Sequence, residues 1–143
     1  MHSAKIQLEI KENIHVVNIT SEIKKIIEES KIEHGLVNIY TQHTTTGIRI
    51  NEDEPGLIED FKSFMKKLVP NGGRYEHDDL TKREVPKDER INGHSHIQAF
   101  LLGASETIPI ENNKLQLGPW QSIFFVDLDG ENRKRTILIN ISD

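Results

Sequence analysis

Hydrophobic and polar residues alternate near both ends of the chain. In residues 6–10 and in residues 137–141, every second position is Ile or Leu. A period of two residues is typical of a β-strand with one buried face. Other short apolar segments predict strands at residues 14–19, 36–42, 48–50, 106–110, 115–117 and 120–128.

Two longer segments have the spacing of an amphipathic helix. In residues 57–68, apolar positions recur every three or four residues, which places them on one helix face. Pro55 suits the first turn of this helix, and Asp53 is the expected N-cap. An earlier helix is expected to begin at an N-cap on Thr20 and to stop at Gly35, because Gly readily ends a helix.

Between residues 74 and 92 the chain is polar and lacks any apolar period. Connections of this length inside a domain are usually functional or disordered. A third, short helix is predicted to follow at residues 95–102, where it would bury Ile97, Phe100 and Leu101.

The order of these elements predicts an α+β fold. Strands joined by hairpins, with helices inserted between some of them, indicate an antiparallel β-sheet or sandwich core with two to three helices packed on it. The length of 143 residues is close to the commonest domain size, so one domain covering residues 1–143 is expected.

Charge and composition exclude several kinds of partner. The net charge of -5 argues against nucleic acid as a partner, and Arg133, Lys134 and Arg135 are interpreted as a solvated hairpin end. No apolar segment is long enough to cross a membrane, and the first residues lack the apolar stretch of a signal peptide, so a cytoplasmic location is expected. Because cysteine is absent, a transition metal would need His, Asp or Glu as ligands.

Three of the seven histidines are candidates for one polar pocket. His43 precedes three threonines and a glycine; this segment is interpreted either as a polar edge strand or as a set of donors to a phosphate. His77 lies in the long polar segment. Of the pair His94 and His96, the second is expected to face inward. Three imidazoles with a fourth position left to water would make an open zinc site.

Four segments, taken in order, resemble the YjbQ family, whose members are often labelled secondary thiamine-phosphate synthase. The matching segments are residues 43–52, residues 75–78, residues 95–103 and residues 117–121. The chain departs from the family at Pro119, where the usual residue is small and hydroxylated. The resemblance implies a compact α+β fold, a homotrimer and a metal-dependent enzyme that acts on a phosphorylated small molecule, with thiamine-phosphate synthesis as a secondary activity.

The resemblance also implies roles for individual residues. The metal, for which zinc is the expected ion, would be held by His43, His77 and His96. Glu52 or Asp78 would move a proton. The substrate would be bound by residues that follow the first histidine or lie close to the expected pocket: Thr44, Thr45, Thr46, Asn51 and Gln121. The alternative is a protein that binds a metabolite, forms an oligomer and has no catalytic activity.

Overall fold

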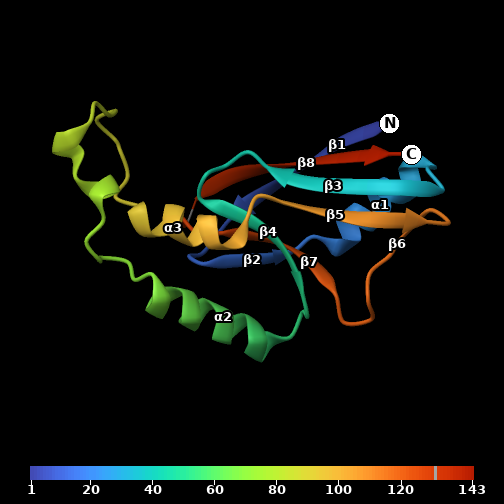
Figure 1. Cartoon of the computed structure of the whole chain (residues 1–143), viewed down its shortest axis with the longest axis horizontal. Coiled ribbons are helices and arrows are strands. Elements are labelled where there is room, and N and C mark those ends of the chain that lie inside the picture. Colours follow the sequence, from blue (N-terminus) through green and yellow to red (C-terminus); the bar gives the residue numbers. More distant parts are fainter. Residues whose placement is uncertain (131) are drawn as a thin grey trace.

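Figure 1 shows the computed structural model, which describes residues 1–130 and 132–143. Its helices are α1 (Thr20–Ser30), α2 (Pro55–Leu68) and α3 (Gly93–Leu102). Its strands are β1 (His2–Ile10), β2 (His15–Asn18), β3 (His34–Thr41), β4 (Thr46–Asn51), β5 (Ser105–Glu111), β6 (Lys114–Leu115), β7 (Ser122–Asp127) and β8 (Arg133–Ser142). Two short 3₁₀ turns, Glu76–Asp78 and Leu80–Lys82, lie in the long polar segment.

The strands form two antiparallel sheets. One has the order β1-β8-β3-β5-β6, and the other has the order β2-β7-β4. The sheets curl into a half-barrel, and the three helices complete an α+β fold, as the order of elements predicts. In Figure 1, α1 lies behind the larger sheet, whereas α2 and α3 lie at the other end of the molecule.

The alternating residues of the terminal strands form much of the core. Ile137, Ile139 and Ile141 of β8 are fully buried, and Ile6 and Ile10 of the neighbouring β1 pack into the same cluster. Each buried aliphatic side chain of this size contributes about 1.5–3 kcal/mol relative to an exposed one. The period of two in the sequence therefore identifies the core face of these strands correctly.

Helix α1 differs from the prediction at both ends. Its N-cap is Ile19, and the Thr20 hydroxyl donates to the side chain of Asn18 instead of capping the helix. The helix ends at Ser30, followed by Lys31 in the left-handed conformation. Gly35 belongs to β3, where a Cβ atom would lie 2.0 Å from the carbonyl oxygen of Ser142. A close approach of two strands, and not a helix end, therefore requires glycine at this position.

Helix α2 begins one residue later than the predicted cap implies. Glu54 is the N-cap and accepts hydrogen bonds from the backbone N–H groups of Gly56 and Leu57, at 2.8 and 2.6 Å. Asp53 accepts from the side chain of Asn18. With 14 residues, α2 is the longest helix in the described part of the chain, where no helix could span a membrane.

Helix α3 buries several polar residues and exposes three of its larger apolar residues. Ile97, Phe100 and Leu101 are 44%, 87% and 52% exposed, so the prediction that they are buried is wrong. Ser95 and Gln98 are buried instead and donate to backbone carbonyl groups. Satisfying these carbonyls fixes the rotation of the helix, because an unpaired buried polar group is costly.

Candidate functional site

The Thr-rich segment forms a turn between β3 and β4. The hydroxyls of Thr41 and Thr46, at the two ends of the turn, lie 2.8 Å apart and are buried. The Thr41 hydroxyl also accepts from the His43 backbone N–H, and the Thr46 hydroxyl donates to the His43 carbonyl. These contacts hold the turn closed and leave the side chains of Gln42 and Thr44 exposed to solvent.

The ring of His43 is fixed by the neighbouring strand β8. The backbone N–H of Thr136 donates to Nε2 of His43 at 3.1 Å. Burial lowers the pKa of His43, and the nearby guanidinium group of Arg135 lowers it further. The neutral imidazole must therefore carry its proton on Nδ1, since Nε2 is an acceptor.

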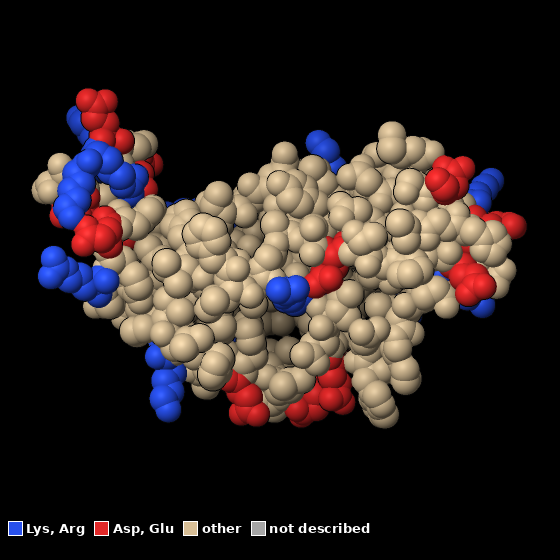
Figure 2. All heavy atoms as spheres, in the orientation of Figure 1, with Lys and Arg blue, Asp and Glu red and all other residues tan. Residues whose placement is uncertain are grey.

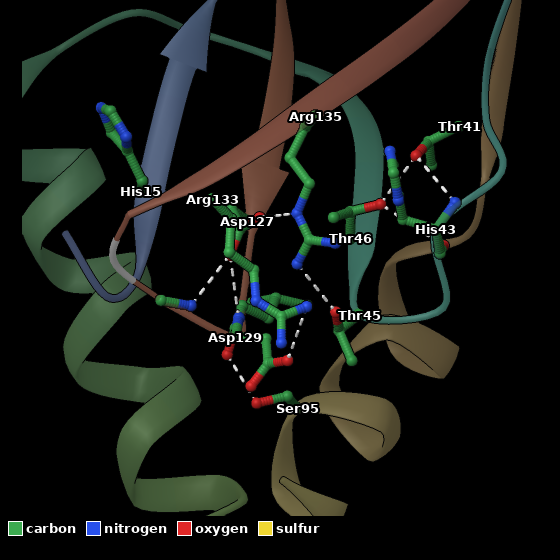
Figure 3. A network of polar contacts seen from close by, with 12 residues as sticks. His15, Thr41, His43, Thr45, Thr46, Ser95, Asp127, Asp129, Arg133 and Arg135 are labelled. Carbon is green, nitrogen blue, oxygen red and sulfur yellow. Dashed lines mark hydrogen bonds and ion pairs between the residues drawn. The ribbon is translucent and has the colours of Figure 1, made fainter. Parts of the chain in front are cut away.

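A buried ion pair lies beneath the turn (Figure 3). Nε of Arg135 lies 2.6 Å from Oδ2 of Asp127, and these side chains are 5% and 0% exposed. Arg135 also donates to the Thr45 hydroxyl at 3.0 Å, so it joins β8 to the turn. Asp127 accepts in addition from the backbone of Asp129 and Gly130. The interpretation of Arg135 as part of a solvated hairpin end is therefore wrong, because its charge is neutralised by a carboxylate on β7.

Asp129 connects two further arginines. It forms ion pairs with Arg90 at 3.2 Å and with Arg133 at 3.5 Å. The side chain of Asn92 donates to the same carboxylate at 2.8 Å. Together with the ion pair of Asp127, three guanidinium groups face two carboxylates, and the cluster carries one excess positive charge.

His77 and His96 lie against each other. Their ring centroids are 4.5 Å apart, although 19 residues separate them in the sequence. Asp78 holds the polar segment in place, because its side chain accepts from the backbone N–H of Gly93 at 2.8 Å, at the start of α3. Burial lowers the pKa of His96, and the adjacent His77 lowers it further.

Some of these groups line a cavity of about 320 Å³, which we name the histidine–arginine pocket. Its lining is largely polar: Gln42, His43, Thr44, Thr45, Asn92, His96, Asp129, Arg133 and Arg135. A second hollow of about 440 Å³ shares Gln42, His43, Thr44 and His96 and extends along Tyr40 and Phe100. The pocket therefore opens onto an aromatic surface beside α3.

The structure brings together some of the residues that the sequence proposes and separates others. His43, Thr44, Thr45 and His96 line the pocket, and His77 contacts His96. Thr46 lies beneath the turn, where its hydroxyl bonds to Thr41.

Three other proposed residues lie elsewhere. Asn51 and Glu52 line a different cavity, next to α2, and five residues of β4 correspond to about 16 Å between Thr46 and Asn51. Gln121 accepts from the backbone N–H of Gly118 at 2.8 Å in the turn before β7. The neighbouring Trp120 is 74% exposed in that turn and does not start the strand as expected.

The three histidines, as arranged, do not fit a metal centre. Among the described residues there is no group of three or more His, Asp or Glu side chains that could hold an ion. Nε2 of His43 is occupied by the Thr136 N–H. Nε2 of His77 lies 3.4 Å from a guanidinium nitrogen of Arg83, which would repel a bound cation. Zinc binding stays a prediction of the resemblance.

The arginines and aspartates of the pocket were missed by the sequence reasoning, although a signal was present. Arg133 and Arg135 continue the alternation of Ile137, Ile139 and Ile141, so they share the inward face of β8. A charged residue on the same face of a strand as a row of buried apolar residues needs a partner of opposite charge. Asp127, at the end of β7 in the other sheet, is that partner for Arg135.

Comparison with known proteins agrees with this architecture. The family described as UPF0047 protein YjbQ-like matches residues 4–143. A UPF0047 protein of Archaeoglobus fulgidus is 40% identical over 133 residues, which cover 93% of this chain and 96% of the relative. UPF0047 protein YugU of Bacillus subtilis is 31% identical over 95% of this chain and 96% of its own length.

Solved structures show the same fold. A YbjQ-like protein of unknown function from Sulfolobus solfataricus superposes with a TM-score of 0.87 and 33% identity, over 98% of this chain and 95% of its own. A protein of the yjbq/upf0047 family from Clostridium acetobutylicum gives 0.85 and 34%, over 97% and 99% of the two chains. This chain therefore belongs to the YjbQ-like UPF0047 family.

Proposed function

We propose that this protein is an enzyme that binds a phosphorylated small molecule in the histidine–arginine pocket. The observation that carries the proposal is an excess of positive charge at the pocket, because Arg133 and Arg135 line it with one carboxylate, Asp129. The surrounding cluster has the same excess, since Arg90 pairs with Asp129 and Arg135 with Asp127. A phosphate group supplies the missing negative charge and accepts bidentate hydrogen bonds from guanidinium groups. The volume of about 320 Å³ suits a small metabolite.

Arg133 is the arginine best placed to meet such a ligand. Its side chain is 32% exposed, and among the residues that the structure describes its one ion pair is the 3.5 Å contact with Asp129. Arg135, in contrast, already donates hydrogen bonds to Asp127 and Thr45, and these bonds support the turn. Nδ1 of His43 supplies a neutral donor beside these charges, because Nε2 accepts from Thr136.

The reaction that the resemblance implies is thiamine-phosphate synthesis from hydroxymethylpyrimidine diphosphate and thiazole phosphate. The thiazole nitrogen attacks the methylene carbon, the bond between this carbon and the diphosphate oxygen breaks, and pyrophosphate leaves. The thiazole nitrogen has no proton to lose, so this step requires no general base. The contribution of the pocket would be donors that stabilise the charge growing on the leaving group. Proton transfer by Glu52 or Asp78 is not needed for this step.

The zinc ion is a separate proposal. The contact between His77 and His96, with ring centroids 4.5 Å apart, favours it. A third ligand from His43 would require the release of the Thr136 N–H, and Arg83 would have to leave His77. Elemental analysis of purified protein, before and after dialysis against a chelator, tests it. Fewer than about one metal ion per three chains would contradict it.

The homotrimer is also a proposal, and the apolar face of α3 supports it. Exposed Ile97, Phe100 and Leu101 form a continuous stripe on one helix, which is unusual for a surface in contact with water only. Phe100 also lines the hollow next to the histidine–arginine pocket. A neighbouring copy that packs on α3 would therefore close the pocket on the side where Phe100 lies.

A matched pair of variants tests the pocket. Pyrophosphate is the probe, and its affinity is measured by titration calorimetry for Arg133→Met and Lys134→Met. Each variant removes one positive charge from β8, but Lys134 points to the opposite face of the strand and is exposed. We expect R133M to weaken binding about tenfold or more and K134M about twofold or less. Equal effects of the two variants would contradict the proposal.

Turnover separates the enzyme from the non-catalytic alternative. The wild-type protein is incubated with hydroxymethylpyrimidine diphosphate and thiazole phosphate, and thiamine phosphate is measured by chromatography. Product that disappears in R133M and persists in K134M supports catalysis in this pocket. Tight binding of pyrophosphate without any product would favour a metabolite-binding protein.

A further inference from the structure

We infer that a second cavity, between α2 and the smaller sheet, binds a hydrophobic organic cation such as an aromatic quaternary ammonium ion. This cavity, which we name the α2 cavity, has a volume of about 450 Å³. It is separate from the histidine–arginine pocket and lies at the opposite end of β4. Its lining consists of Val16, Arg49, Ile50, Asn51, Glu52, Leu57, Ile58, Asp60, Phe61, Phe64, Leu102, Phe124 and Val126.

The walls of the α2 cavity are apolar and aromatic. Phe124 and Val126 come from β7, whereas Phe61 and Phe64 come from α2. Helix α2 packs on the sheet over a small area, because Met65 is its one buried residue and Phe64 is 59% exposed. A space between apolar walls favours an apolar ligand over water.

The mouth of the cavity is acidic. Residues 51–60 contain five Asp or Glu residues and no Lys or Arg. Of the charged lining residues, Arg49 is neutralised by Glu106 at 2.9 Å. Glu52 and Asp60 form no ion pair with any residue that the structure describes. Figure 2 shows the hollow on this face and the acidic side chains gathered beside it, over the beginning of α2.

These two features together define the class of ligand. An anion would be repelled by Glu52 and Asp60, and a neutral apolar molecule would gain nothing from them. An organic cation gains from the carboxylates and also from the faces of the phenylalanine rings, which attract a positive charge. A basic apolar segment of another protein would use the same attraction, but a volume of about 450 Å³ suits a small molecule.

The test uses two probes of similar size and opposite charge. Benzyltrimethylammonium and phenylmethanesulfonate are titrated into the full chain, and binding is followed by the NMR signals of the methyl groups of Val16, Ile50 and Val126. We expect saturable shifts with the cation and at least tenfold weaker binding of the sulfonate. Equal binding of both probes, or shifts that do not saturate, would overturn the inference.

Charge variants locate the site. Glu52→Gln combined with Asp60→Asn removes the two charges of the mouth, and Glu22→Gln combined with Glu29→Gln removes two exposed charges from α1 as a control. We expect the first pair to weaken cation binding about fivefold or more, and the control pair to leave it within about twofold. An unchanged affinity in E52Q/D60N would overturn the inference. Since pyrophosphate binding in the other pocket is measured separately, failure of one site does not imply failure of the other.

Discussion

The backbone N–H of Thr136 donates to Nε2 of His43 across 3.1 Å, which joins the Thr-rich turn to strand β8. This bond decides what His43 is able to do. An imidazole nitrogen that accepts a hydrogen bond from the backbone is not available to a metal ion or to a substrate proton. In this arrangement the neutral ring of His43 offers an N–H donor at Nδ1, whereas a metal-ligand role would require the bond to Thr136 to break.

The tautomer of His43 is the first prediction. At pH 8 we expect the ring to be neutral, with its proton on Nδ1, because the Thr136 amide occupies Nε2. Two-dimensional NMR that correlates ring nitrogens with ring protons distinguishes the tautomers. A proton on Nε2, or a shift of the Nε2 resonance on adding zinc, would contradict the assignment and restore His43 as a ligand.

The second prediction concerns stability and pH. Burial lowers the pKa values of His43 and His96 below the usual 6.5, so the unfolded chain binds protons more readily than the folded one. Their contribution to stability is therefore complete above about pH 6.5 and is lost as the pH falls through the lower, folded-state values. Urea unfolding between pH 7.5 and pH 5.5 should show a falling free energy of unfolding. The fall should become smaller in His96→Asn, and an identical fall in both proteins would count against this cause.

The third prediction concerns the buried pair of Arg135 and Asp127. Asp127→Asn leaves a guanidinium group that is 5% exposed without its counter-charge. We expect the free energy of unfolding to fall by about 3 kcal/mol or more, as is common when one partner of a buried pair is removed. The matched control is Glu106→Gln, which breaks the more exposed pair with Arg49 and should cost about 1 kcal/mol or less. A loss in D127N no greater than in E106Q would show that the buried pair is not important for stability.

The fourth prediction concerns the apolar face of α3. Phe100→Asp combined with Leu101→Asp places charges on side chains that are 87% and 52% exposed, so the fold of the single chain should tolerate them. If three copies meet at this face, sedimentation should change from a mass near three times 16.4 kDa to that of one chain. Trp120→Ser, which alters an exposed aromatic residue in the turn before β7, serves as the control. A wild-type protein that sediments as a monomer would refute the trimer.

The sequence by itself determines the elements of this fold and much of its core. The period of two in residues 137–141 and the spacing of residues 57–68 correctly predict β8 and α2, since burial of one face dictates both patterns. The residues around His43, His77 and His96 also point to the family to which the chain belongs.

Only the tertiary structure decides which polar groups meet. Whether Asp127 neutralises Arg135 depends on how strands of the two sheets pack against each other, which leaves little local trace in sequence. The rotation of α3 is decided in the same way, because the buried carbonyl groups that Ser95 and Gln98 satisfy belong to other segments. The spacing of apolar residues along the sequence shows which face of a helix or strand is buried. The partners of a buried hydrogen-bonding group are instead set by the packing of the whole chain.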